Sequence, residues 1–202
     1  MAIELKNSLF IHNPKCGGRT VKQMLKKYVK NCVVLGDDIY ESHATPNTTK
    51  QVFGFIRHPA TFIHSLWTHR SKKKAHGSDW NWHPDIRLEQ ECKSQDYNTF
   101  VENILDKKNM VWDYYQHYLG KYPNVQYCKM EQLPDSLIQV LKLNNEDFNE
   151  EAIRKNIYVH GANNKQLGKP ISVNESMTYN QLKKLVQVSE NELCRRFDYH
   201  AF

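Results

Sequence analysis

Short apolar runs alternate with stretches of helical periodicity along most of the chain. Residues 8–12 form a β-prone run, and after two glycines the apolar side chains from Val21 to Tyr28 follow helical spacing. This order predicts a strand, a glycine turn and a helix. Further strands are predicted at residues 32–35, 51–56 and 125–128. Further helices are predicted from Pro59, over residues 97–105, 111–119 and 136–143, and from a Thr178–Gln181 capping box.

Strands that alternate with helices favour an α/β fold with a mainly parallel sheet flanked by helices. The length favours one domain over residues 1–202. Residues 70–96 are polar and weakly periodic, so they are predicted to form a long loop of the kind that often carries function.

The composition is that of a folded globular protein, with 40% hydrophobic and 25% charged residues. No run approaches the ~18 apolar residues of a membrane span, and residues 1–8 lack the apolar core of a signal peptide. We therefore expect no membrane span and a cytoplasmic location. The five cysteines are widely spaced and contain no CxxC, which favours reduced thiols and no structural metal.

Positive charge gathers near the start of the chain. The net charge is +6, and residues 5–36 hold seven Lys or Arg and no acid, with a second basic group at Arg70 and residues 72–74. Such stretches indicate an anionic partner: nucleotide phosphate, nucleic acid, acidic glycan or anionic lipid. For the second group, lysines that serve solubility alone are an equal alternative.

Residues 13–20, Asn-Pro-Lys-Cys-Gly-Gly-Arg-Thr, lie between the first predicted strand and helix. Glycines there let backbone N–H groups approach an anion, and the helix N-terminus adds a positive dipole, so phosphate binding is predicted. The segment is not a Walker A loop, because its lysine precedes the glycines. A tight turn that needs glycine for its backbone is the alternative.

A second segment, Phe-Ile-Arg-His-Pro at residues 55–59, places Arg57 at a strand end and Ser65 about two turns into the next helix. Together the two segments resemble the carbohydrate and bacterial sulfotransferases that use 3′-phosphoadenosine 5′-phosphosulfate (PAPS). The Ser-His-Ala-Thr-Pro run at residues 42–46 resembles that family's His-x-Thr-Ala element. Residues 129–133 and 196–199 are similar to its Glu-x-Leu and Phe-Gly-Tyr segments.

The resemblance implies a fold like that of the P-loop nucleotide kinases and in-line transfer of a sulfuryl group from PAPS to an acceptor hydroxyl, foremost of a carbohydrate. No metal is required and the product nucleotide is PAP. His43 is the implied general base, and Lys15 the donor to the leaving oxygen. The implied cofactor-binding residues are Lys15, Cys16, Gly17, Gly18, Arg19, Thr20, Arg57 and Ser65. The chain departs from the family at Cys16, Arg19, Phe62 and Trp67.

Several alternatives stay open. The base has competitors in Asp38, Glu41 and His64, and the aromatic residues Trp80 and Trp82 with His83 either stack on a sugar or form a small core. Lys165 and Lys169 are further candidates for the cofactor. The rival functions are a nucleic-acid-binding module and an atypical P-loop nucleotide kinase. The expected partner is a glycan or another anionic acceptor rather than nucleic acid.

Overall fold

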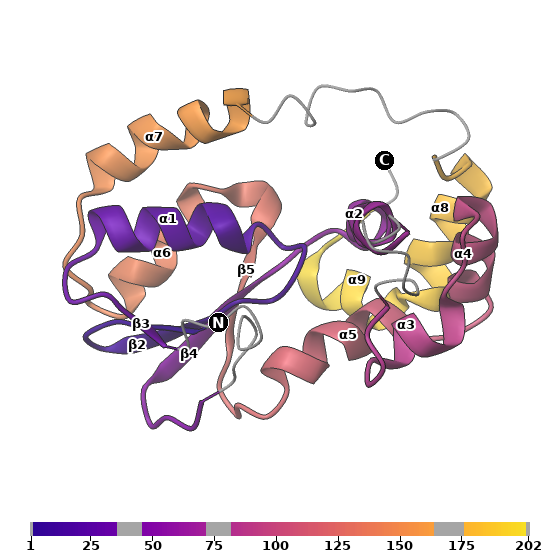
Figure 1. Ribbon diagram of the computed structural model, residues 1–202, viewed down its shortest axis with the longest axis horizontal. Helices are drawn as coiled ribbons and strands as arrows, with labels where there is room; N and C mark the ends of the chain where they lie inside the picture. The colour runs from indigo at the N-terminus through magenta and orange to yellow at the C-terminus, as the bar shows by residue number, and fades with distance from the viewer. Residues whose placement is uncertain (1, 36–45, 72–81, 164–175, 201–202) are drawn as a thin grey trace, which may run out of the picture. The chain divides into compact units, whose positions relative to one another are not determined.

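The computed structural model describes residues 2–35, 46–71, 82–163 and 176–200 (Figure 1). The chain divides into two compact units, one made of Met1–Arg57 with Tyr118–Lys169 and the other of His58–His117 with Pro170–Phe202. The described strands all belong to the first unit, so the candidate phosphate loop is part of an α/β layer structure. A single domain over residues 1–202 stays a prediction.

The first unit is built on a five-stranded sheet of order β3-β1-β2-β4-β5. Its strands are β1 (Ala2–Glu4), β2 (Ser8–Ile11), β3 (Val33–Leu35), β4 (Gln51–Ile56) and β5 (Gln126–Lys129). β2, β4 and β5 run parallel, whereas β1 is antiparallel to both β2 and β3. The α/β class is confirmed, but the sheet is mixed, and the prediction of a mainly parallel sheet is wrong.

The antiparallel part arises from a tight connection at the start of the chain. Only three residues separate β1 from β2, a length that permits a hairpin and excludes a parallel crossover. The Leu5 N–H donates to the Ser8 carbonyl at 2.9 Å and closes the turn. The buried carboxylate of Glu146 accepts from the Asn7 N–H and the Ser8 hydroxyl, which holds this hairpin in place.

The first unit also contains α1 (Gly18–Tyr28), η2 (Met130–Gln132), α6 (Asp135–Leu143) and α7 (Glu150–Asn163). α1 buries the apolar face that its spacing predicts, and α7 runs beside it (Figure 1). α6 packs against β5. In the sheet, Phe10 on β2 and Phe53 on β4 bring their rings to 5.5 Å between centroids, so apolar packing joins the two strands that carry the candidate site.

The described part of the second unit is helical. It contains α2 (Pro59–Arg70), α3 (Arg87–Cys92), α4 (Tyr97–Leu105), most of α5 (Met110–Leu119), α8 (Tyr179–Lys184), the π-helical turn η4 (Leu185–Ser189) and α9 (Asn191–Phe197). The capping box of Thr178 and Gln181 is confirmed. The long loop predicted at residues 70–96 is wrong over α3, because Leu88 and Cys92 anchor a short helix in the core.

Within the described ranges, the structure contains no helix with the length and apolar character that crossing a membrane requires.

Candidate anion-binding site

The loop between β2 and α1 has an unusual backbone. Lys15 and Gly17 are both left-handed, with φ of 64° and 77°, and only Cys16 separates them. Turns of this kind point successive backbone N–H groups to one side and form a concavity that favours anions. Gly17 adopts this conformation without strain because it has no Cβ. For Lys15 the same left-handed conformation is unfavourable, because its Cβ crowds the backbone.

The N-terminus of α1 adds three backbone donors to this loop. The first intrahelical bond runs from the Val21 N–H to the Gly17 carbonyl at 3.1 Å. The N–H groups of Gly18, Arg19 and Thr20 therefore have no acceptor inside the helix. The first turn contains no acid, and no side chain caps it. The positive end of the helix dipole thus remains available to an anion.

The loop is anchored to the sheet beneath it. Asn13 is buried, and its Nδ2 donates to the Phe55 carbonyl at the end of β4, at 3.1 Å. The Cys16 side chain is fully buried. The space next to Gly17 is taken by Met130, which follows β5. These contacts attach the loop to the carboxyl ends of β4 and β5, so its donors are held in position before any ligand binds.

Arg57 links the two sequence segments on which the resemblance rests. It follows β4, the parallel neighbour of β2, and its Nη1 donates to the Lys15 carbonyl at 3.4 Å. The carboxyl ends of neighbouring parallel strands meet at one edge of a sheet, where α/β proteins bind their ligands. The structure therefore brings Lys15 and Arg57 together, although 42 residues separate them in the chain.

A third cation ends the next strand. Lys129 is the last residue of β5 and pairs in register with Ile56 of β4, so it lies at the same edge as Arg57. Its carbonyl accepts from the Ser136 hydroxyl at 2.9 Å, which fixes the chain as it enters α6. Sequence reasoning singled out residues 129–133 only as a family-like segment. The order of the strands was needed to place this lysine beside the phosphate loop.

His12 was also missed. It is the first residue after β2, and its ring lies where a Cβ on Gly18 would project. Its position directly after a strand and before the glycine loop was the available signal. Close packing against His12 therefore requires glycine at position 18, apart from any part that its backbone N–H takes in binding an anion.

The other predicted site residues are placed as follows. Ser65 lies half-buried on α2, in the second unit. His43 lies outside the described residues, as do its competitors Asp38 and Glu41, together with Trp80, Lys165 and Lys169. Trp82 is described, and its ring lies 5.3 Å from that of Phe100, so it belongs to a small aromatic core of the second unit.

Two further observations concern a thiol nucleophile and a metal site as possible chemistry at this edge of the sheet. Burial raises the pKa of the Cys128 thiol on β5 to about 12, which keeps it protonated and a poor nucleophile. Among the residues that the structure describes, no three His, Cys, Asp or Glu side chains are grouped as metal ligands. The groups that the edge does offer are cations and backbone N–H donors, which suit phosphate.

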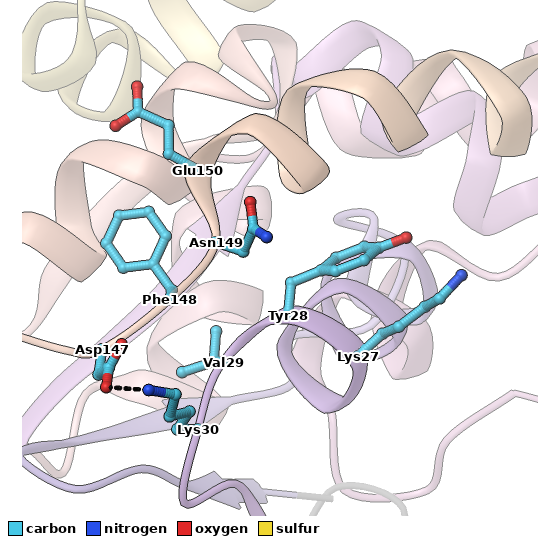
Figure 2. A pocket seen from close by; sticks show the side chains of 8 residues that line it. All are labelled: Lys27, Tyr28, Val29, Lys30, Asp147, Phe148, Asn149 and Glu150. Atoms are coloured by element: carbon cyan, nitrogen blue, oxygen red, sulfur yellow. Dashed lines mark hydrogen bonds and ion pairs between the residues drawn. The ribbon is translucent and has the colours of Figure 1, made fainter.

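A hollow of about 580 Å³ opens at the opposite end of α1 (Figure 2). It is lined by residues 27–30 and 147–150, and an ion pair of 2.8 Å joins Lys30 to Asp147 at its rim. This end of the helix carries the negative end of the dipole, and one of the two lysines that line the hollow, Lys30, is already neutralised by Asp147. The hollow is therefore a poor phosphate site compared with the loop at the other end.

Comparison of the chain with protein-family models, with curated proteins and with solved structures gave no match in any of the three. Function is therefore inferred from the residues at the β2–β4–β5 edge.

Proposed function

We propose that this protein is a sulfotransferase that moves a sulfuryl group from PAPS to an acceptor hydroxyl, with a carbohydrate as the favoured acceptor. The observation that carries the proposal is the hydrogen bond from Arg57 Nη1 to the Lys15 carbonyl. It joins the two segments that the resemblance assigns to the two phosphate groups of one nucleotide. A ligand with phosphates on both its 5′ and 3′ sides matches two neighbouring cationic subsites.

The proposal includes the fold. Parallel strands β2, β4 and β5, with a phosphate loop and a cation at their carboxyl ends, fit the arrangement of the P-loop nucleotide kinases and sulfotransferases. The unit differs by β1, which lies between β3 and β2 and pairs antiparallel with both, so that the sheet is mixed. Mixed sheets are common among α/β proteins.

Several groups have separate roles in the proposed transfer. The leaving phosphate oxygen gains negative charge as the bond to sulfur breaks, and the Lys15 ammonium supplies a compact positive charge to it. The N–H groups at the start of α1 hold the 5′-phosphate, and the Thr20 hydroxyl adds a donor. Arg57 binds the 3′-phosphate. A further hydrogen bond from Ser65 to this phosphate stays a prediction from the sequence. His43 takes the proton from the acceptor hydroxyl.

Ligand-dependent thermal unfolding tests the cofactor. We expect PAP at about 100 times its Kd to stabilise the protein by about 2.7 kcal/mol, a midpoint shift of roughly 5 to 10 °C, and ATP with magnesium to have a much smaller effect. Arg57→Ala is expected to abolish the shift. Arg154→Ala is the matched control, because Arg154 lies on α7 and is exposed, with Asp135 and Glu150 as its ion-pair partners.

Three outcomes decide between the proposals. A shift specific to PAP that is lost only in Arg57→Ala supports PAPS as cofactor. An equal or larger shift with ATP and magnesium supports an atypical nucleotide kinase instead. No shift with either nucleotide refutes both, and nucleic acid becomes the first ligand to test.

A separate experiment tests whether His43 is the general base. Sulfuryl transfer from PAPS to a panel of carbohydrate acceptors is measured for the His43→Ala variant and for the wild type. We expect a loss of turnover with PAP binding unchanged. Near-complete turnover in this variant would show that another group takes the proton, and His64 is then the next substitution.

A further inference from the structure

The second unit has a hollow of about 590 Å³ on its surface, formed by α8, η4, α9 and the residues that follow α9. This volume lies within the range of small-molecule sites. Three of the side chains that line it are buried, namely Val186, Cys194 and Tyr199. The Tyr199 N–H donates to the Cys194 carbonyl at 2.9 Å, which fixes the chain after α9. We call this feature the α8–α9 hollow.

The π-helical turn η4 separates α8 from α9. Its bond runs from the Glu190 N–H to the Leu185 carbonyl at 2.7 Å, five residues back instead of four. Such turns bend helices and occur often at functional sites. Val186 and Gln187 of this turn line the α8–α9 hollow, as does Asn191, whose Nδ2 donates to the Gln187 carbonyl at 2.8 Å. The irregular backbone therefore belongs to the wall of the hollow.

Two cations line the α8–α9 hollow without a counter-charge. Lys183 and Arg195 are both exposed, and no carboxylate of the described residues lies within ion-pair distance of either. The one acid among the described lining residues is Asp198, whose Oδ1 lies 2.9 Å from His200 Nε2. Burial raises the pKa of the Cys194 thiol to about 12, so this thiol stays neutral. Positive charge therefore dominates the lining.

An exposed aromatic ring lies at one end of the same lining. Tyr179 is the first residue of α8, and 66% of its surface is exposed. A ring left open to solvent offers a face against which a flat or cyclic ligand can stack. The exposed Gln187 amide adds hydrogen-bond donors and an acceptor suited to hydroxyl groups. The hollow thus combines groups for an anion with groups for a polar ring.

We propose that the α8–α9 hollow binds a small phosphate monoester of a ring compound, the chemistry shared by sugar phosphates and nucleoside monophosphates. A phosphate monoester carries almost two negative charges at neutral pH, which match the two cations, whereas a carboxylate carries one. The Arg195 guanidinium can bind two phosphate oxygens at once, and Lys183 supplies a compact charge. Tyr179 stacks on the ring. The inference does not depend on the proposed sulfuryl transfer, because none of these residues belongs to the phosphate loop.

The test is the double variant Lys183→Gln/Arg195→Gln in the full chain, in which glutamine keeps the helix propensity of the residues it replaces. Lys93→Gln/Lys108→Gln is the matched control, because it removes the same charge from exposed positions of the second unit that do not line the hollow. Tyr179→Ala and Tyr179→Phe test the ring. Calorimetry measures the binding of glucose 6-phosphate, AMP, glucose, glucuronate, inorganic phosphate and a single-stranded oligonucleotide.

We expect the double variant to bind its phosphate ester at least about tenfold more weakly than the wild type, and the control to stay within about threefold. Tyr179→Ala is expected to weaken binding about fivefold or more, and Tyr179→Phe to restore it. Glucose is expected not to bind. Glucuronate and inorganic phosphate, which each lack one half of the recognised chemistry, should bind less tightly than the better ester. Whether AMP or glucose 6-phosphate binds more tightly identifies the source of the phosphate.

Arg57→Ala shows where the ester binds. We expect this variant to bind the ester as the wild type does, because Arg57 belongs to the phosphate loop, and the Lys183→Gln/Arg195→Gln variant to keep its stabilisation by PAP. A loss of ester binding in Arg57→Ala alone would place the ester at the loop and overturn the inference.

Other results would also overturn it: wild-type protein that binds neither ester, equal losses in the double variant and the control, glucuronate or inorganic phosphate bound as tightly as the esters, or an oligonucleotide bound more tightly than AMP. Failure of the proposed transfer is seen separately, as wild-type protein that PAP does not stabilise. Ester binding that is lost only in the double variant would still establish the α8–α9 hollow as a site.

Discussion

The imidazole ring of His12 occupies the position into which a Cβ on Gly18 would project. The first residue after β2 therefore packs directly against the first residue of α1. This contact sets how closely the strand and the helix approach each other on either side of the phosphate loop.

Gly18→Ala is expected to destabilise the protein by about 1 to 3 kcal/mol, because the added methyl group and the His12 ring cannot occupy the same space. Urea unfolding measures the effect. In the double variant His12→Ala/Gly18→Ala, much of the loss should be recovered, and a double-mutant cycle isolates the coupling between the two positions.

Gly17→Ala is the comparison. Its cost comes from φ of 77°, a conformation that costs an L-residue about 1 to 2 kcal/mol, and His12→Ala should not relieve it. A Gly18→Ala protein as stable as the wild type would contradict the packing described here.

Two substitutions of Lys15 separate the effect of its backbone conformation on stability from the effect of its charge on sulfuryl transfer. Because its φ is 64°, Lys15→Gly is expected to be more stable than Lys15→Ala by about 1 kcal/mol. Both substitutions remove the ammonium group, so both should lower sulfuryl transfer by the same factor, about 10²- to 10³-fold. Thermal unfolding and turnover are measured on the same samples.

Asn31 offers a control for the backbone effect, since its φ is 56° and it lies between α1 and β3. Asn31→Gly should again be more stable than Asn31→Ala, with transfer unaffected. Full transfer by Lys15→Gly would remove Lys15 from the proposed chemistry while leaving the conformational argument intact.

Stability is expected to depend on pH through Glu190. Its carboxylate is buried at the N-terminus of α5 and accepts the N–H groups of Val111 and Trp112 at 2.8 and 3.2 Å. Burial raises its pKa from 4.5 to about 8, against the lowering effect of these bonds, and the nearby Asp113 raises it further. The folded protein therefore holds a proton that the unfolded chain releases between these two pH values.

The raised pKa of Glu190 means that the protein becomes less stable as the pH rises. Stability from the protonated carboxyl is complete below about pH 4.5 and is lost as the pH rises toward about 8. We expect the free energy of unfolding to fall across this window, by at most about 1.4 kcal/mol per pH unit for one proton. Glu190→Gln should flatten this dependence in urea titrations, whereas Glu192→Gln, which removes an exposed carboxylate of α9, should keep it.

The second unit contains a buried ion pair that should be costly to break. Arg70 contacts both oxygens of Glu89 at 2.8 Å, and the Glu89 side chain is fully buried. The His83 N–H also donates to it. Burial raises the pKa of Glu89, and the Arg70 charge opposes that rise. Arg70→Met is expected to cost about 3 to 5 kcal/mol at neutral pH, because it leaves a buried carboxylate without its partner.

Replacing both members, as Arg70→Met/Glu89→Leu, should restore most of that stability. The exposed pair of Lys155 and Glu151 on α7 provides the contrast, since Lys155→Met should change the stability by less than about 1 kcal/mol. If the double variant were as unstable as Arg70→Met, the unpaired carboxylate of Glu89 would not be the cause of the lost stability.

Local pattern was sufficient for the longer elements. α1, α4 and α6 carry apolar residues at helical spacing, and β4 is a six-residue segment in which only Gln51 is polar, so each was predicted close to its observed bounds. β1 was missed because three residues are too few to show a period. α3 was missed because it is six residues long and its buried Glu89 is stabilised by Arg70, a residue outside the helix. α7 was missed altogether.

The chemistry of the phosphate loop could be read from the order of residues 13–20, since glycines, a lysine and a helix start are local properties of the chain. That Arg57 meets Lys15, and that Lys129 joins the same edge, depends on β4 lying between β2 and β5. Strand order is set by hydrogen bonds and apolar packing between segments far apart in sequence, which no local period encodes. The antiparallel pairing of β1 with β3 arose in the same way, between segments about 30 residues apart, whereas its pairing with β2 follows from the three-residue connection.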